Sequence, residues 1–302
     1  MDTTVAERRE SGPKALVRRH PIAAFLLLGL GSVYLLSIIP ILMQYDVIPG
    51  KNFPARLGLD MERAFAGVLT ILLFGSALLV TSLDGGRRAV RQLFRRILRW
   101  RVNVGWWLVA LVALPMLTVI FAVLLGDISV LPSRNVLWRE LLGILIAWLL
   151  INLWEEAAWT GFLQTRLERR HNFFLAAFLT GIPFAAVHMP LQVITGEVRS
   201  AVDFAVNFAL LMVLVIFVRS LFGMVLRGTA NSLLLVGLTH AMFNRSNNID
   251  GIAADILPGG DSRQLAALLA TVVLAIVLGL VLRRKLSRSY RRELDEAEDR
   301  AA

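Results

Sequence analysis

The sequence predicts an all-α, polytopic membrane protein, with about eight transmembrane helices around a buried site of glutamate and histidine side chains. Of its 302 residues, 57% are hydrophobic and only 18% are charged, whereas soluble domains average about 45–50% and about 25%. Apolar runs of bilayer length recur along the chain, and cations gather in every second connection. This pattern argues against a soluble enzyme and against a disordered scaffold.

The net charge of +10 does not indicate nucleic-acid binding. The basic residues stand in short clusters between apolar runs, which is typical of membrane loops. The chain contains no cysteine. Disulfides, thiolate catalysis and cysteine-ligated zinc or iron–sulfur clusters are therefore excluded.

Eight apolar runs are long enough to cross a hydrocarbon core, which takes roughly 20 helical residues. They cover residues 21–43, 62–83, 104–126, 136–163, 173–194, 203–222, 227–244 and 264–283. The first is too long for the apolar region of a signal peptide, so we interpret it as a span. The fourth run is long and is interrupted by a glutamate pair, and we interpret it as one tilted helix. In the fifth, Pro190 cannot donate to the carbonyl of Ala186, which predicts a kink or a helix end.

The charges of the connections predict the orientation. Clusters of cations precede the first span and follow the second, fourth and eighth spans, and Arg219 and Arg227 bound the predicted loop after the sixth. The other connections contain few cations. By the positive-inside rule, both termini lie in the cytoplasm, and we expect a multi-pass protein of the cell membrane.

The predicted organisation is one membrane domain with two short ends. Residues 1–20 form a cytoplasmic segment, residues 21–283 form the transmembrane domain, and residues 284–302 form a polar cytoplasmic tail. Within the domain, residues 84–103 alternate arginines with apolar side chains. This spacing predicts an amphipathic cytoplasmic helix on anionic lipid, although a simple positive-inside anchor explains the arginines equally well.

Four ionisable residues lie deep within the apolar runs: Glu155, Glu156, His188 and His240. Asn244 follows His240 by one helical turn, on the same face. From the cytoplasmic edges, a rise of about 1.5 Å per residue puts Glu155, His188 and His240 about 17, 22 and 20 Å deep. Ionisable groups in a bilayer are costly unless paired or hydrated, so four at one depth indicate a functional site.

These residue types fit the hydrolysis of an amide or ester. A carboxylate in apolar surroundings can act as a general base near neutral pH, and a neighbouring imidazole can orient the attacking water. A second histidine and an amide can donate hydrogen bonds to an oxyanion. The same glutamates and histidines could also bind zinc. No GxSxG, HExxH or Walker motif occurs in the chain.

Three short patterns occur in order on three predicted spans: Glu155-Glu156-x-x-x-Thr160, Phe184-x-x-x-His188 and His240-x-x-x-Asn244. They resemble the EExxxR, FxxxH and HxxxN motifs of the CPBP (CAAX protease and bacteriocin-processing, or ABI) intramembrane endopeptidases. The motif core covers residues 136–245. Thr160 stands where the family motif has arginine, which puts the role of Glu156 in doubt. We expect Thr160 and Trp159 to hold Glu156 instead.

The resemblance implies that Glu155 activates water together with His188, while His240 and Asn244 stabilise the oxyanion. The family has been described both as metalloproteases and as glutamate-dependent enzymes. We expect no required metal, since a Glu–His pair needs only one water; if zinc binds, its ligands would be Glu155, His188 and His240. The substrate would be a membrane-associated peptide or protein. The arginine-rich, lysine-poor composition suggests a bacterial source, where a prenylated substrate is not expected.

Two other functions are compatible with a buried Glu/His set. The first is a transporter or proton relay, because such residues also move protons across membranes. Transporters often contain inverted repeats and paired broken helices, and the sequence has no such repeat. The second is a non-catalytic immunity scaffold, against which the complete set of Glu155, His188, His240 and Asn244 argues.

Overall fold

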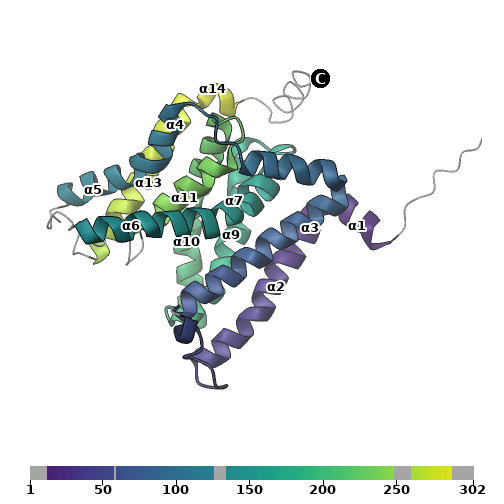
Figure 1. Ribbon diagram of the computed structural model, residues 1–302, viewed down its shortest axis with the longest axis vertical. Helices are drawn as coiled ribbons and strands as arrows, with labels where there is room; N and C mark the ends of the chain where they lie inside the picture. Colours follow the sequence, from purple (N-terminus) through teal and green to yellow (C-terminus); the bar gives the residue numbers. More distant parts are fainter. Residues whose placement is uncertain (1–11, 58, 126–133, 248–259, 288–302) are drawn as a thin grey trace, which may run out of the picture.

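A computed structural model describes residues 12–57, 59–125, 134–247 and 260–287 (Figure 1). Within these ranges the chain forms helices and no strand. The α-helices are α1 (Pro13–Arg19), α2 (Pro21–Gln44), α3 (Met61–Ile97), α4 (Val104–Leu108), α5 (Leu114–Leu124), α6 (Arg134–Ile146), α7 (Leu153–Ala158), α8 (Thr165–Glu168), α9 (Phe173–Thr195), α10 (Ala201–Gly228), α11 (Leu233–Asn247), α13 (Gly260–Val281) and α14 (Arg283–Leu286). A 3₁₀ turn, η1 (Pro54–Leu57), and three π-helical segments, η2 (Val109–Ala113), η3 (Ala147–Asn152) and η4 (Trp159–Gln164), complete the described elements. The all-α prediction is confirmed.

In the part of the chain that the structure describes, 7 helical segments are long and apolar enough to cross a membrane. They are Pro21–Gln44, Met61–Ile97, Val104–Leu124, Leu137–Glu168, Phe173–Thr195, Ala201–Gly228 and Gln264–Val281. The protein is therefore a polytopic, multi-pass membrane protein.

The eighth predicted span, 227–244, is the short helix α11. It has 15 residues, or roughly 22 Å at about 1.5 Å per residue, which is less than the roughly 30 Å of a hydrocarbon core. The prediction placed its start too early, because α10 continues to Gly228. Helix α11 is too short to span the hydrocarbon core, and most of its residues are buried among the other helices.

Arg219 and Arg227 do not bound a loop, contrary to the sequence interpretation. Both lie inside α10 and are buried, with 0% and 3% of their surfaces exposed. Each makes an ion pair with a glutamate from the helical segment that ends at Glu168, before α9. These two arginines therefore provide no evidence on the orientation of the protein in the membrane.

Helix α9 does not end at Pro190. It continues to Thr195, through both Pro183 and Pro190. The carbonyl of Ala186, which Pro190 cannot satisfy, instead accepts a hydrogen bond of 2.7 Å from the Tyr34 hydroxyl of α2. A neighbouring helix thus supplies the missing donor, as membrane helices containing proline require.

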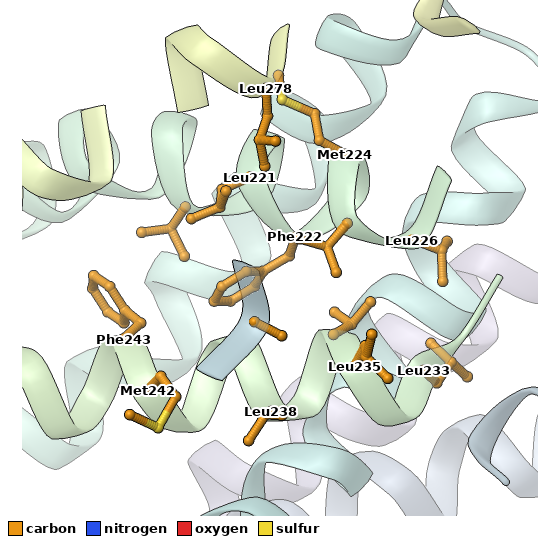
Figure 2. Close-up of a cluster of buried hydrophobic side chains, with 14 of the residues drawn as sticks. Leu221, Phe222, Met224, Leu226, Leu233, Leu235, Leu238, Met242, Phe243 and Leu278 are labelled. Carbon is orange, nitrogen blue, oxygen red and sulfur yellow. The ribbon is translucent and has the colours of Figure 1, made fainter. Parts of the chain in front are cut away.

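Helix α11 lies at the centre of the molecule and packs against α5, α7, α10 and the π-segments η2 and η3 (Figure 1). Its apolar side chains face those of α10 in one buried cluster (Figure 2), whose members include Leu221, Phe222, Leu235, Leu238 and Met242. At Gly237, an added Cβ would lie only 2.7 Å from the Cα of Leu153. This glycine therefore permits the close approach of α11 and α7, the two helices that carry His240 and the glutamate pair.

The predicted amphipathic helix is the second half of α3, after a bend at Gly86. Gly86 has φ 61° and ψ −157°, a conformation that favours glycine. After the bend, Leu93 and Ile97 are buried in the same core as α10 and α11. Arg96 donates a 2.9 Å hydrogen bond to the carbonyl of Gly161 in η4. Part of the apolar face therefore packs on the protein, and its contact with anionic lipid stays a prediction.

Several connections predicted to share one side of the membrane do lie together. Arg18 donates to the carbonyl of Leu83 at 3.1 Å, and Arg166 pairs with Asp84 at 3.0 Å. The Ser232 hydroxyl, between α10 and α11, donates to the carbonyl of Arg99. These contacts join the N-terminal segment, the connections that follow the second and fourth predicted spans, and the turn between α10 and α11, which lies within the predicted span 227–244. Residues 1–11 and 288–302 of the predicted cytoplasmic ends lie outside the described residues.

Candidate active site

The glutamate pair lies in α7, between the π-helical segments η3 and η4. The fourth predicted span is one continuous helical segment from Arg134 to Glu168, as expected, although its two π-helical interruptions were not predicted. Such segments are rare and often mark functional sites, because the wider turn changes the direction of nearby side chains. Here they flank α7 on both sides.

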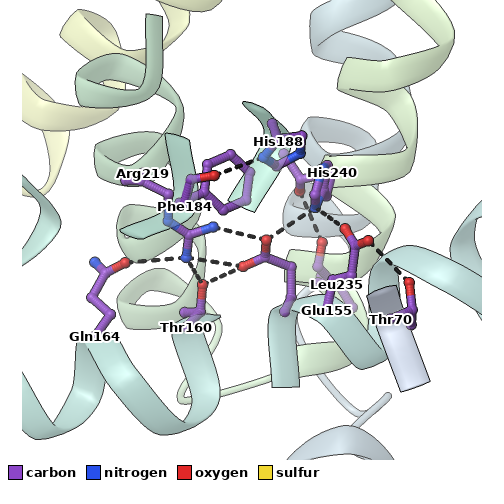
Figure 3. A network of polar contacts seen from close by, with 11 residues as sticks. Thr70, Glu155, Thr160, Gln164, Phe184, His188, Arg219, Leu235 and His240 are labelled. Atoms are coloured by element: carbon purple, nitrogen blue, oxygen red, sulfur yellow. Dashed lines mark hydrogen bonds and ion pairs between the residues drawn. The ribbon is translucent and has the colours of Figure 1, made fainter. Parts of the chain in front are cut away.

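Both carboxylate oxygens of Glu156 are occupied (Figure 3). Its Oε1 accepts from Nη1 of Arg219 at 2.8 Å and lies 3.0 Å from Nδ1 of His240. Its Oε2 accepts from Nη2 of Arg219 at 3.1 Å and from the Thr160 hydroxyl. Glu156 is 0% exposed. With these partners, Glu156 is poorly placed to take a proton from an incoming water.

Arg219 is the counter-ion that sequence analysis missed. It enters from α10, its guanidinium lies 5.0 Å from the Phe184 ring centroid and 5.3 Å from that of Phe222, and it also donates to the Thr160 hydroxyl. A planar guanidinium suits such aromatic surroundings and a two-point contact with a carboxylate. The expectation that Thr160 holds Glu156 agrees with the structure. Trp159 does not share that role, since its buried Nε1 has no hydrogen-bond partner among the described residues.

Glu155 differs from Glu156 in having one oxygen without a close hydrogen-bond partner among the described residues. Its Oε1 accepts from the Thr70 hydroxyl of α3 at 3.0 Å. Its Oε2 lies 4.0 Å from Nδ1 of His240, beyond hydrogen-bond distance. The residue is 7% exposed. Glu155 is therefore the member of the pair that can accept a further hydrogen bond.

His188 is held by the first residue of its own motif. Its Nδ1 lies 2.7 Å from the carbonyl oxygen of Phe184. Because a carbonyl only accepts, Nδ1 carries the proton and the neutral ring keeps a lone pair on Nε2. The Phe184 ring lies beside both imidazoles, with centroid distances of 4.6 Å to His188 and 6.1 Å to His240. The His188 ring can thus accept a proton or a hydrogen bond inside the site.

His240 lies between the carboxylates and the ring of Phe222, whose centroid is 4.9 Å from its own. Its Nδ1 lies 3.0 Å from Glu156 Oε1 and 4.0 Å from Glu155 Oε2, so it is closer to the carboxylate that Arg219 holds. Asn244 lies one turn further along α11 and is half-buried. Within the described residues it has no side-chain hydrogen bond. The structure thus brings Glu155, Glu156, His188 and His240 together and leaves Asn244 at a distance of one turn.

A row of polar residues continues from the site along the same helical segment. Glu156, Thr160, Gln164 and Glu168 follow at intervals of four residues. Gln164 accepts from Arg219 at 3.4 Å and donates to Glu168 at 3.2 Å, and Glu168 accepts from Arg227 at 2.8 Å. Two buried ion pairs therefore join this segment to α10, about three helical turns apart on this segment and about two on α10.

The expected zinc ligands do not form a ready metal site. Within the described ranges, no three histidine, aspartate or glutamate side chains are arranged so that they could hold a metal ion. Glu156 is engaged by Arg219, and Nδ1 of His240 lies 4.0 Å from the free oxygen of Glu155. A zinc ion needs three protein ligands at about 2.0–2.2 Å. Whether Glu155, His188 and His240 require a metal for activity stays a prediction.

Comparison with known families agrees with the motifs. Residues 137–246 match the family described as type II CAAX prenyl endopeptidase Rce1-like. A search of curated proteins gave no match. The matched stretch includes all three motifs, confirms the resemblance to the CAAX protease family, and indicates a protease. The segment that holds the Glu/His site is thus similar to the Rce1-like family of CAAX proteases.

Proposed function

We propose that the protein is an intramembrane endopeptidase that hydrolyses peptide bonds of membrane-associated peptides or proteins. The observation that carries the proposal is the unequal state of two adjacent glutamates. Glu156 is saturated by Arg219 and Thr160, whereas Glu155 keeps one oxygen free beside two imidazoles. A general base needs an acceptor within hydrogen-bond reach of water, and Glu155 offers it.

In the proposed reaction, Glu155 takes a proton from water while Nε2 of His188 orients that water. The water oxygen then bonds to the carbonyl carbon, and the carbonyl oxygen becomes an oxyanion. When the carbon–nitrogen bond breaks, the protonated Glu155 returns its proton to the leaving amine. Hydrolysis is thus balanced with one water consumed and the site regenerated.

The oxyanion would be stabilised by His240 and Asn244 from α11. Two carboxylates and the Arg219 guanidinium sum to one negative charge, so a protonated His240 would leave the site neutral. Its Nδ1–H would then face the carboxylates, and its Nε2–H would be available to the oxyanion. The half-buried amide of Asn244 would supply the second donor.

We further propose a bacterial cell membrane as the location, with both termini in the cytoplasm and residues 84–103 in contact with anionic lipid. In this proposal residues 21–283 form the protease domain, between short cytoplasmic ends 1–20 and 284–302. A topology test uses reporter fusions after Arg101 and after Asp250, which should report opposite sides of the membrane. The same side for both would contradict this arrangement.

The function is tested with purified protein in liposomes and two quenched fluorescent probes. One is a transmembrane peptide without lipid, and the other is a farnesylated peptide ending in a CAAX sequence. Wild type should cleave at least one probe, Glu155→Gln should cleave neither, and the exposed control Glu197→Gln should match wild type. A trapped pH dye tests the alternative function. Proton flux that depends on Glu155, without cleavage of either probe, would support a proton relay and contradict the protease.

A further inference from the structure

We propose that Arg219 replaces the arginine missing from the first motif and is the positioning residue that keeps Glu156 out of the reaction. It holds Glu156 as a permanent carboxylate and thereby leaves Glu155 as the base. This inference rests on the proposed function in one respect, the effect on turnover. Its electrostatic part concerns Glu156 alone and can be tested without any substrate.

The position of the guanidinium supports this replacement. The family arginine would stand at residue 160, four residues after Glu156, where this chain has threonine. Arg219 comes from α10, yet its Nη2 donates both to Glu156 Oε2 and to the Thr160 hydroxyl. The positive charge therefore lies next to the motif position, although it is carried by another helix.

The surroundings of Arg219 keep its guanidinium group in a fixed position. The residue is fully buried, and two aromatic rings lie near its guanidinium. A buried carboxylate without its counter-ion is costly and tends to take up a proton. Loss of Arg219 would thus leave two adjacent glutamates competing for protons beside His240, which lies within 4.0 Å of both. The fixed pair Arg219–Glu156 removes that competition.

A second buried ion pair, Arg227–Glu168, serves as a matched control for a purely structural role of Arg219. Arg227 is on the same helix, two turns further on, and pairs with Glu168 in an equally buried position. Removal of Arg227 should destabilise the fold to a degree similar to removal of Arg219. The contacts given for Glu168 are with Gln164 and Arg227, so loss of its ion pair should have little effect on turnover per folded molecule.

The first arm of the test measures turnover of a probe that wild type cleaves. Arg219→Gln should lower kcat by up to about 100-fold, the cost of misplacing a reacting group by about 1 Å, with little change in KM. The double variant Thr160→Arg/Arg219→Gln returns the charge to the motif position and should recover most of the lost kcat. Arg227→Gln should retain kcat near wild type. A double variant as inactive as Arg219→Gln, or an equal loss in Arg227→Gln, would overturn the proposal.

The second arm measures the protonation of Glu156 by infrared spectroscopy and needs no cleavage. Arg219→Gln should show the carbonyl band of a protonated carboxylic acid, which a further Glu156→Gln change removes. The Thr160→Arg/Arg219→Gln protein should lack this band. Its absence in Arg219→Gln would overturn the proposal. If Arg219→Gln fails to fold, Arg219→Lys, which keeps the charge but not the two-point contact, should fold without the band; a band there would also overturn it. If wild type cleaves no probe, the proposed function fails while this arm still decides the role of Arg219.

Discussion

Gly237→Ala should separate the two helices that carry the site. The added methyl carbon would lie 2.7 Å from Leu153 Cα and 3.0 Å from Leu153 N, whereas carbon atoms pack at about 3.5–4.0 Å. Both neighbours are backbone atoms, so α11 must retreat by about 0.8–1.3 Å to restore that contact distance. His240 is three residues further along α11 and would move with it. A misplacement of about 1 Å can cost about 100-fold in rate.

Gly237→Ala should lower turnover strongly but change the free energy of unfolding only slightly. Overpacking costs about 1–3 kcal/mol, but alanine is favoured over glycine in a helix by up to about 1 kcal/mol. We therefore expect a net loss of about 0–2 kcal/mol, measured by thermal unfolding in detergent. Gly75→Ala is the control, because a Cβ there meets nothing within 4 Å. Equal turnover in Gly237→Ala and Gly75→Ala would refute the reasoning.

Three further predictions concern the support of the site and its metal requirement. Tyr34→Phe leaves the Ala186 carbonyl without its donor, so unfolding should become easier by about 1 kcal/mol with kcat unchanged; a large loss of kcat with unchanged stability would contradict this reading. Arg96→Gln removes the hydrogen bond to the Gly161 carbonyl, so amide hydrogen exchange should rise across residues 87–97; protection equal to wild type would mean that this contact does not hold the segment. Exhaustive chelation should leave turnover intact, and a loss that zinc restores would show that the reaction requires the metal.

The sequence was sufficient to predict the helical membrane architecture and to identify the four ionisable residues that meet in the site. Motif spacing and depth sufficed, because a helix fixes both the face and the rise of each residue. Helix ends were less predictable. The turn between α10 and α11 follows Gly228 rather than the cations at 219 and 227. The available signal for the buried ion pairs is an arginine inside an apolar run, as Arg219 is in the run 203–222. Such an arginine is better interpreted as buried than as part of a loop.

Other features depend on contacts between segments that are distant in the chain. Glu140 lies in the fourth apolar run, yet only the structure shows that it pairs with Arg245 of α11. The hydroxyl of Thr70 that binds Glu155 comes from 85 residues away. The π-helical segments around α7 leave no clear pattern in composition. The contacts of Thr70 with Glu155 and of Arg219 with Glu156 decide which glutamate can accept a further hydrogen bond, and no periodicity in the sequence could predict them.

The central claim, that Glu155 activates water for peptide hydrolysis, is tested most directly with ¹⁸O-labelled water. Membranes that contain wild type, Glu155→Gln or Glu197→Gln are incubated in labelled water, and membrane peptides are compared by mass spectrometry. The account predicts new carboxyl termini that carry ¹⁸O in wild type and Glu197→Gln, and none of these in Glu155→Gln. The same labelled termini in Glu155→Gln, or none in any sample, would contradict it.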